Sequence, residues 1–289
     1  MASTQSARIT ELYERWATDL ARPEQVEDRE TDDSWGDLTT EPRGVDYVET
    51  EAGGGPAMWA APKGVPADRV ILALHGGGFV GGSMYTHRKL FGHVAKQAGA
   101  RALVLGPPHT PRHRYPAQLD VAFAAYRELL DRGARVALLG DSSGGGLAVA
   151  TMLRARDGGL PLAVGMALIS PWVDLEATGD AYDTGHDPYF TLELVRSLAA
   201  MYTSDLGDPL ANPARADLTG LPPAYVQVGA WEALLDDSRL LAAKLDVAEL
   251  DEFPEMLHTF QIGAGRVPEA TDAVARLASW LRPRLEVAR

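Results

Sequence analysis

Short apolar runs recur along the chain and alternate with stretches in which the apolar residues have helical spacing. The runs predict strands near residues 57–61, 70–74, 101–105, 135–139, 163–169, 224–228 and 247–252. The stretches with helical spacing predict helices near residues 86–98, 116–132, 143–156, 235–246 and 268–285. This alternation is typical of a mostly parallel sheet with helices on both faces, so we predict an α/β fold.

The N-terminal region adds an amphipathic helix and a hairpin. The apolar residues of this helix share one face: Ile9, Leu12, Tyr13, Trp16 and Leu20. An acidic stretch from about residue 24 to 41 follows, and then a strand near residues 45–48. Gly53-Gly54-Gly55 suits the turn of a hairpin between that strand and the next one.

Composition and charge exclude several classes of protein. The chain has 289 residues, a formal net charge of −13 and a pI near 5.0, which argues against nucleic acid as a partner because nucleic-acid binding needs clustered lysine and arginine. It has no cysteine, which excludes disulfides, thiol catalysis and cysteine-ligated zinc. No cationic N-terminal region precedes an apolar core, and no apolar run approaches about 18 residues. We therefore expect a cytoplasmic protein with no membrane partner.

Ser142 is the candidate nucleophile. It lies in Gly140-Asp141-Ser142-Ser143-Gly144, between the strand near 135–139 and the helix near 143–156. A Gly-x-Ser-x-Gly turn between a strand and a helix is a nucleophile elbow, in which small flanking residues allow a tight turn that presents the serine hydroxyl. The pattern alone is weak because glycine-rich turns with a serine are common. A partner histidine and an oxyanion loop decide whether it is catalytic.

His75-Gly76-Gly77-Gly78-Phe79 is the candidate oxyanion loop. It follows the strand near 70–74, and its glycines let backbone N–H groups approach a ligand closely and stabilise negative charge in acyl transfer. The three glycines Gly76, Gly78 and Gly81 also fit the dinucleotide-binding pattern, which needs an acidic residue at the end of the next strand. That strand, near 101–105, ends in Gly106-Pro107-Pro108, so we expect no dinucleotide cofactor.

His258 is the candidate base, because it follows a short strand-like run near the C-terminus and lies downstream of the serine and of the candidate acids. Glu232 comes just after the strand near 224–228, on a loop from which a carboxylate could reach the imidazole. Asp236 is the alternative acid. Asp236 and Asp237 also suit the first turn of a helix, where the macrodipole favours acidic side chains.

Together these motifs resemble the hormone-sensitive-lipase-like branch of the α/β-hydrolases, and within it the bacterial esterases close to monoterpene lactone hydrolases. The order serine, acid, histidine is also that of the α/β-hydrolases. The resemblance spans about residues 47–258 and rests on residues 75–83, 86–88, 140–145, 170–175, 187–188 and 221–223, on the Glu232 segment and on His258. It implies an α/β-hydrolase fold with a mostly parallel central sheet and a helical cap.

The resemblance also implies the activity, a serine carboxylic-ester hydrolase. Ser142 would attack the carbonyl carbon, His258 would transfer the proton, and Glu232 would orient the histidine. The oxyanion donors would be the N–H groups of Gly77, Gly78 and Ser143, supported by the motif residues His75, Gly76 and Asp141. The substrate would be a small, fairly hydrophobic ester or lactone, no cofactor or metal would take part, and the chain could form a homodimer.

Two alternatives remain at this point. An amidase or an acyltransferase would use the same residues with another leaving group or acceptor. A catalytically silent small-molecule receptor on the same fold would lack a member of the triad, whereas all three positions are filled here.

The predicted domains are an N-terminal helical cap segment, residues 1–44, and a catalytic domain, residues 45–289, with a cap insertion at about 180–221. The insertion carries one apolar helical face: Leu192, Val195, Leu198, Ala199 and Tyr202. The insertion and the N-terminal helix would form a cap over Ser142. An apolar and aromatic wall of this kind favours small hydrophobic acyl or alcohol groups.

Residues 107–114 depart from the branch. It usually carries Tyr-Arg-x-Ala-Pro-Glu-His-Pro, whereas this chain has Pro107-Pro108-His109-Thr110-Pro111-Arg112-His113-Arg114. The acidic position has become Arg112, so the buried arginine–carboxylate arrangement usual to the branch cannot form as such. The spacing of His109 and His113 suits a metal pair, but no third ligand is evident. We therefore expect a solvated loop that carries no chemistry.

Overall fold

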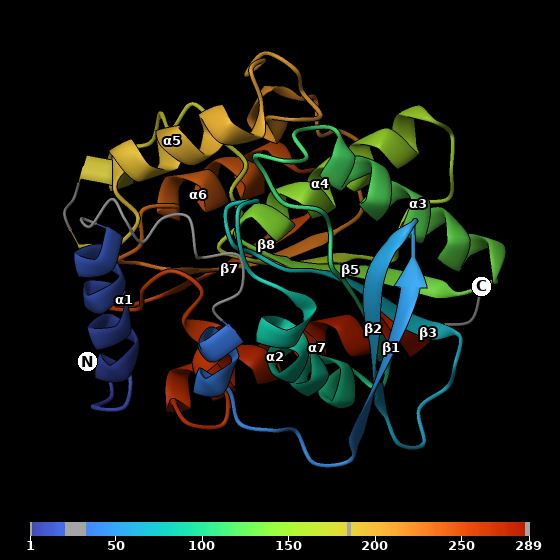
Figure 1. Cartoon of the computed structure of the whole chain (residues 1–289). Coiled ribbons are helices and arrows are strands. Elements are labelled where there is room, and N and C mark those ends of the chain that lie inside the picture. Colours follow the sequence, from blue (N-terminus) through green and yellow to red (C-terminus); the bar gives the residue numbers. More distant parts are fainter. Residues whose placement is uncertain (1, 21–32, 184–185, 287–289) are drawn as a thin grey trace.

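The structure is a computed structural model that describes residues 2–20, 33–183 and 186–286 (Figure 1). Its strands are β1 Val45–Ala52, β2 Gly55–Pro62, β3 Arg69–Leu74, β4 Arg101–Leu105, β5 Arg135–Asp141, β6 Met166–Ile169, β7 Ala224–Gly229 and β8 Ala248–Phe253. They form one sheet in the order β1-β2-β4-β3-β5-β6-β7-β8. β2 runs antiparallel to β1 and β4, and all the other neighbours are parallel. This sheet confirms the predicted α/β fold.

Gly53 and Gly54 form the turn between β1 and β2, as predicted. Their φ angles are 61° and 79°, in the left-handed region that a tight hairpin turn requires. Gly55 is already the first residue of β2 and pairs with Ala52. The hairpin places β1 at one edge of the sheet, and β8 forms the opposite edge.

The strands contribute alternate side chains to two cores, one on each face of the sheet. In β3, for example, Val70, Leu72 and Leu74 belong to one core, and Ile71 and Ala73 belong to the other. Three helices cover the first face: α3 Ala117–Asp131, α4 Ser143–Asp157 and α6 Leu235–Lys244 (Figure 1). Two helices cover the second face: α2 Met84–Ala98 and α7 Pro268–Glu286 (Figure 1).

Two further helices are α1 Ala7–Leu20 and α5 Leu192–Tyr202 (Figure 1). Both bury the apolar face that the sequence predicts. The buried members are Ile9, Leu12, Tyr13, Val195, Leu198, Ala199 and Tyr202, while Trp16 and Leu192 are half-buried. The side chain of Leu20 and residues 21–32 of the acidic stretch lie outside the described residues. The division into a cap and a catalytic domain stays a prediction, and residues 184–185 of the predicted insertion are also outside the described residues.

The observed boundaries differ from the predicted ones at several elements, and β1, predicted near 45–48, extends to Ala52. The strand predicted at 163–169 begins only at Met166, because the ladder between β5 and β6 starts where Leu138 pairs with Met166. α2 begins at Met84 rather than at residue 86, because Ser83 caps it by accepting hydrogen bonds from the next N–H groups of the helix. Short 3-10 helices complete the fold: η3 Asp33–Leu38, η4 Asp180–Asp183, η5 Pro213–Arg215 and η6 Phe260–Gly263.

Candidate active site

Ser142 lies on the tight turn between β5 and α4. Its φ angle of 52° is in the left-handed region, which is strained for a residue with a side chain and is typical of a nucleophile elbow. The flanking glycines have a packing reason. A Cβ atom on Gly140 would lie 2.4 Å from the carbonyl oxygen of Gly144, and one on Gly144 would lie 2.1 Å from that of Leu74. The predicted elbow geometry is therefore present.

Glu232 and His258 are hydrogen bonded to each other. Nδ1 of His258 donates to Oε1 of Glu232 at 3.0 Å, and both side chains are fully buried. Burial lowers the pKa of His258, but the carboxylates of Glu232, Asp187 and Asp141 together raise it more, so the net pKa lies above the usual 6.5. A carboxylate in this position fixes the tautomer of the imidazole and leaves Nε2 free to accept a proton.

The alternative acid does not reach the histidine. Asp236 accepts a 2.9 Å hydrogen bond from the N–H of Ala181 and lies 3.5 Å from Arg239. Asp237 is fully buried and accepts hydrogen bonds from the N–H groups of Val173 and Asp174 at 3.0 and 2.8 Å. Of the two candidate acids, Glu232 is thus the one that contacts His258.

Ser142 and His258 are both buried, but they are not hydrogen bonded to each other. Nε2 of His258 has no hydrogen-bond partner among the described residues. Phe190 packs against the imidazole with its ring centroid 4.3 Å away, and it lines the same cavity as Ser142. In enzymes without substrate the hydrogen bond between nucleophile and base is often long, and it tightens when substrate binds.

Ser170 contacts the carboxylate of Glu232, and the sequence analysis did not assign it to the site. Its Oγ donates a 2.7 Å hydrogen bond to Oε2 of Glu232, and the N–H of Gly229 donates to the same oxygen at 2.8 Å. Ser170 therefore orients the carboxylate that orients His258. The available signal was its position directly after β6. There it lies at the carboxyl ends of the parallel strands, as Ser142 and Glu232 do.

The oxyanion loop approaches Ser142 closely through backbone that only glycine adopts readily. Gly77 and Gly78 have φ angles of 119° and 61°. In the described part of the chain, no group accepts a hydrogen bond from the N–H of Gly77, Gly78 or Ser143. These three N–H groups are therefore available to a ligand, and their role as oxyanion donors stays a prediction.

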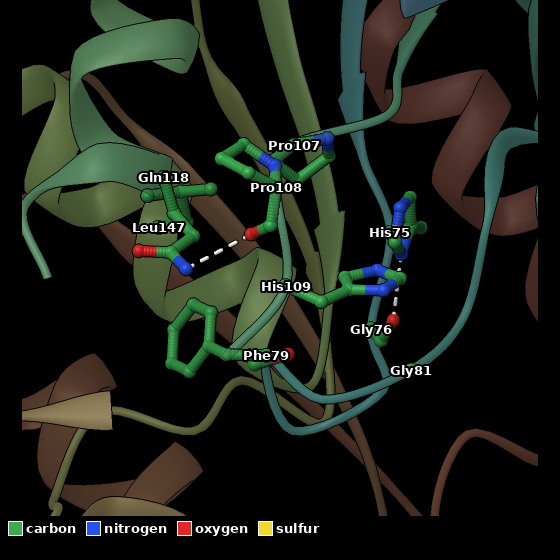
Figure 2. Close-up of a pocket in the computed structure, with 10 residues that line it drawn as sticks. His75, Gly76, Phe79, Gly81, Pro107, Pro108, His109, Gln118 and Leu147 are labelled. Atoms are coloured by element: carbon green, nitrogen blue, oxygen red, sulfur yellow. Dashed lines mark hydrogen bonds between the residues drawn. The ribbon is translucent and has the colours of Figure 1, made fainter. Parts of the chain in front are cut away.

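His75, Gly76 and Asp141 hold the start of this loop in place. Oδ1 of Asp141 accepts a 3.0 Å hydrogen bond from the N–H of Gly76, and Nδ1 of His75 donates to the carbonyl oxygen of Gly76 at 2.7 Å (Figure 2). A Cβ atom on Gly76 would lie 2.5 Å from Oδ2 of Asp141, so only glycine fits here. Burial and the neighbouring His87 lower the pKa of His75 to about 3, so His75 is neutral and supports the loop without acting as a base.

His87 is a second buried histidine that the sequence analysis placed on a helix without giving it a role. It is fully buried on α2, and its Nε2 donates to Oδ2 of Asp141 at 3.2 Å. Burial alone would raise the pKa of Asp141, but His87 keeps it below its usual value. The carboxylate next to Ser142 is therefore ionised and fully hydrogen bonded. The signal for this role was the resemblance at residues 86–88.

A small apolar cavity opens beside Ser142. Its volume is about 220 Å³, part of it open to solvent. Its lining consists of Gly78, Ser142, Trp172, Phe190, Val195, Leu198 and Leu234. α5 contributes Val195 and Leu198 to this wall, and Leu198 packs directly over Gly78, where a Cβ atom would lie 2.9 Å from it.

The loop 107–114 is only partly solvated, which corrects our expectation. His113 is exposed, but His109 is half-buried and its ring lies edge-on to that of His75, with the centroids 6.1 Å apart (Figure 2). Thr110 is buried, and its N–H donates to the carbonyl oxygen of Phe79 at 2.9 Å. The prediction of a solvated turn was wrong for His109 because the loop folds back onto the oxyanion loop rather than into solvent.

Within the described ranges, no three histidine or acidic side chains are grouped as metal ligands. None of the described helices is long and apolar enough to span a membrane.

Comparison with known proteins identifies the fold family. Residues 71–262 match the family model described as alpha/beta hydrolase fold. An acetyl-hydrolase of Streptomyces hygroscopicus is 36% identical over 98% of this chain and 97% of its own length. An esterase of Acinetobacter venetianus is 34% identical over 74% of this chain and 75% of its own.

Solved structures give the same result. An esterase from the bacterial hormone-sensitive lipase family has a TM-score of 0.92 and 38% identity, with 99% of each chain covered. The hormone-sensitive-lipase homologue EstE7, from a metagenome library, has a TM-score of 0.88 and 31% identity, with 99% of this chain and 100% of that chain covered. The chain therefore belongs to the α/β-hydrolase fold family, alongside the bacterial esterases related to hormone-sensitive lipase.

Proposed function

We propose that this carboxylesterase hydrolyses esters of short acyl groups, with Ser142 as nucleophile, His258 as general base and Glu232 as the acid that orients the histidine. The observation that carries the proposal is the buried 3.0 Å hydrogen bond between His258 and Glu232, at the edge of the sheet where the elbow presents Ser142. Ser170 supports the carboxylate through its second oxygen.

The reaction proceeds in two steps. Oγ of Ser142 attacks the ester carbonyl carbon while Nε2 of His258 takes its proton, and Glu232 stabilises the imidazolium that forms. His258 then gives this proton to the departing alkoxide, which leaves an acyl group on Ser142. Water, deprotonated by the same nitrogen, attacks the acyl carbon. The bond between that carbon and Oγ of Ser142 then breaks, His258 returns the proton to Oγ, and the carboxylic acid is released.

The N–H groups of Gly77, Gly78 and Ser143 bind the oxyanion that forms in each step. The backbone that carries the donors of the loop is fixed, because Asp141 and His75 both hydrogen bond to Gly76 at its start. Donors fixed before the reaction need no reorganisation when the charge develops, and one such donor is typically worth about 10²–10³ in rate.

The size of the cavity favours a short acyl chain. The side chains of Trp172, Phe190 and Leu198 line the space beside Ser142, and Leu198 packs over Gly78, which leaves little room for a long chain. The name of the acetyl-hydrolase relative fits the same substrate class. Lactones, including those of terpenoid type, stay within the proposed range because an internal ester presents the same carbonyl. A homodimer and a cytoplasmic location complete the proposal.

A chain-length series tests the proposal. We expect p-nitrophenyl acetate and butyrate to be hydrolysed well and the octanoate poorly, with a burst of p-nitrophenol that does not exceed one per enzyme. A panel of small lactones measured alongside tests the second substrate class. A chain that binds these esters without turnover would be a receptor, and the proposal would be wrong.

A further inference from the structure

Tyr13 connects α1 to the main chain of the catalytic histidine. The ring is fully buried, and its hydroxyl donates a 2.6 Å hydrogen bond to the backbone carbonyl oxygen of His258. The same hydroxyl lies 3.1 Å from Oγ1 of Thr259. Burial raises the pKa of Tyr13 well above its usual value, so the hydroxyl keeps the proton that it donates.

The peptide unit between His258 and Thr259 is held at both of its polar ends. Tyr13 binds its carbonyl oxygen, and Oγ of Ser170 accepts a 3.3 Å hydrogen bond from its N–H. Ser170 in turn donates to Glu232, and Glu232 accepts from the imidazole of His258. A chain of hydrogen bonds therefore runs from the N–H of Thr259 through Ser170 and Glu232 to the imidazole of His258.

This peptide unit needs such support because its backbone is strained. Thr259 has φ and ψ angles of 47° and 34°, which is the left-handed region. A β-branched residue rarely adopts this conformation, and it persists only where the surrounding structure fixes it. Loss of the bond from Tyr13 leaves only the bond to Ser170 on this peptide and allows the backbone of His258 to relax.

A second contact runs from α1 to the imidazole through aromatic rings. Phe190 packs on the ring of His258 at 4.3 Å, and Tyr189 packs on Phe190 at 4.7 Å. From α1, the centroid of Tyr13 lies 6.2 Å from that of Phe190, and Trp16 lies 5.5 Å from Tyr189. α1 therefore supports both the main chain and the ring environment of His258.

We infer that Tyr13 is a positioning residue for His258: by binding its backbone carbonyl, it holds the imidazole in line between Glu232 and Ser142, which makes α1 part of the catalytic machinery. The inference rests on the proposed function, since it concerns the histidine to which that proposal assigns the proton transfer. Tyr13 does not line the cavity beside Ser142, so its effect falls on turnover and not on substrate binding.

Tyr13→Phe removes the hydroxyl and keeps the buried ring. Tyr126→Phe is the control, because the ring of Tyr126 is also fully buried and its hydroxyl donates a 2.7 Å hydrogen bond to a backbone carbonyl, that of Pro161 on the connection between α4 and β6. Both variants lose a tyrosine hydroxyl that donates to a backbone carbonyl, although the bond to Pro161 is only part-buried. If the role of Tyr13 were purely structural, Tyr13→Phe would lose stability and keep kcat, as we expect of Tyr126→Phe.

We expect kcat of Tyr13→Phe for p-nitrophenyl acetate to fall about 10- to 100-fold at unchanged KM, as for a small misplacement of a catalytic group. The acid limb of its pH–rate profile should move to lower pH, because a looser bond to Glu232 raises the pKa of His258 less. The melting temperature of Tyr126→Phe should fall about as much as that of Tyr13→Phe. Its kcat and the acid limb of its pH–rate profile should stay at their wild-type values.

Amide hydrogen exchange supplies a readout that does not depend on activity. The N–H of Thr259 should exchange faster in Tyr13→Phe than in the wild type. In Tyr126→Phe its exchange rate should be unchanged. If Tyr13→Phe and Tyr126→Phe had the same kcat, the same acid limb and the same exchange rate at Thr259, while His258→Ala was inactive, the inference would be wrong and the proposed function would stand. Full activity of His258→Ala would instead overturn the proposed function and the inference with it.

Discussion

The carboxylate of Glu232 accepts a 3.0 Å hydrogen bond from Nδ1 of His258, 26 residues further along the chain. Glu232 lies just after β7, and His258 lies on the turn after β8. Because the two strands are parallel neighbours, the segments that follow them meet at the same edge of the sheet. The sheet topology thus explains why the acid on the loop after β7 lies next to the histidine on the loop after β8.

The first prediction separates the two acids by mutation. Glu232→Gln should lower kcat by about 10³–10⁴-fold, because an amide favours the wrong tautomer and cannot stabilise the imidazolium. Asp236→Asn should change kcat less than about threefold, because Asp236 contacts Ala181 and Arg239 instead. Steady-state kinetics with p-nitrophenyl acetate measure both, and a larger loss in Asp236→Asn would assign the role to that residue.

The second prediction concerns pH. The net pKa of His258 is raised by Glu232 although burial lowers it, and only the neutral imidazole can take the proton of Ser142. Activity should therefore rise with pH through a single limb centred above the usual value of 6.5 for histidine. In the residual activity of Glu232→Gln this limb should move to lower pH. A limb that stays in place in this variant would show that another group titrates.

The third prediction addresses chain length. Leu198 lines the cavity beside Ser142, and its truncation to Ala should make room for longer acyl groups. We expect the ratio of kcat/KM for hexanoate over acetate to rise about tenfold or more, since one methylene in an apolar pocket is worth about 1–3 kcal/mol. Leu129→Ala, in the core of α3, removes the same atoms away from the cavity and should leave the ratio unchanged.

The fourth prediction concerns stability and a buried carboxyl that takes no part in the reaction. Burial raises the pKa of Asp237 from 3.8 to about 7, although it accepts hydrogen bonds from two N–H groups and from Tyr182. The folded chain then binds more protons than the unfolded chain between about pH 4 and 7, so this group destabilises the fold as pH rises through that window.

Asp237→Asn should remove this pH dependence. Relative to the wild type, the variant should gain stability between pH 5 and pH 8, by an amount on the order of a few kcal/mol. Denaturant unfolding at the two pH values measures this difference. A stability difference that is the same at both would show that Asp237 is ionised throughout.

The sequence predicted the sheet and the flanking helices because a buried parallel strand must be apolar along its whole length. Runs such as those of β3 and β5 carry that signal without reference to the rest of the chain. The backbone geometry at Ser142 and at the glycine-rich loop was predictable for a similar reason, since a strained elbow and a close backbone approach need glycine at fixed positions. Local chemistry sufficed for these parts of the site.

The parts that were missed depend on contacts between distant segments. Tyr13 was predicted only as one apolar position of a helix, and its hydroxyl finds His258 across 245 positions of the chain. Ser170 resembles any polar residue after a strand until Glu232 is placed beside it. His109 was predicted to be solvated, because no local pattern shows that its loop folds back onto His75.

The most direct test of the central claim is to locate the serine that becomes covalently modified. A fluorophosphonate reacts with an activated serine hydroxyl, and mass spectrometry of the digested protein identifies the modified residue. We predict one adduct per chain, on Ser142, which is present in Ser143→Ala and absent in Ser142→Ala. An adduct on Ser143, or labelling that persists in Ser142→Ala, would contradict the assignment of Ser142 as the nucleophile.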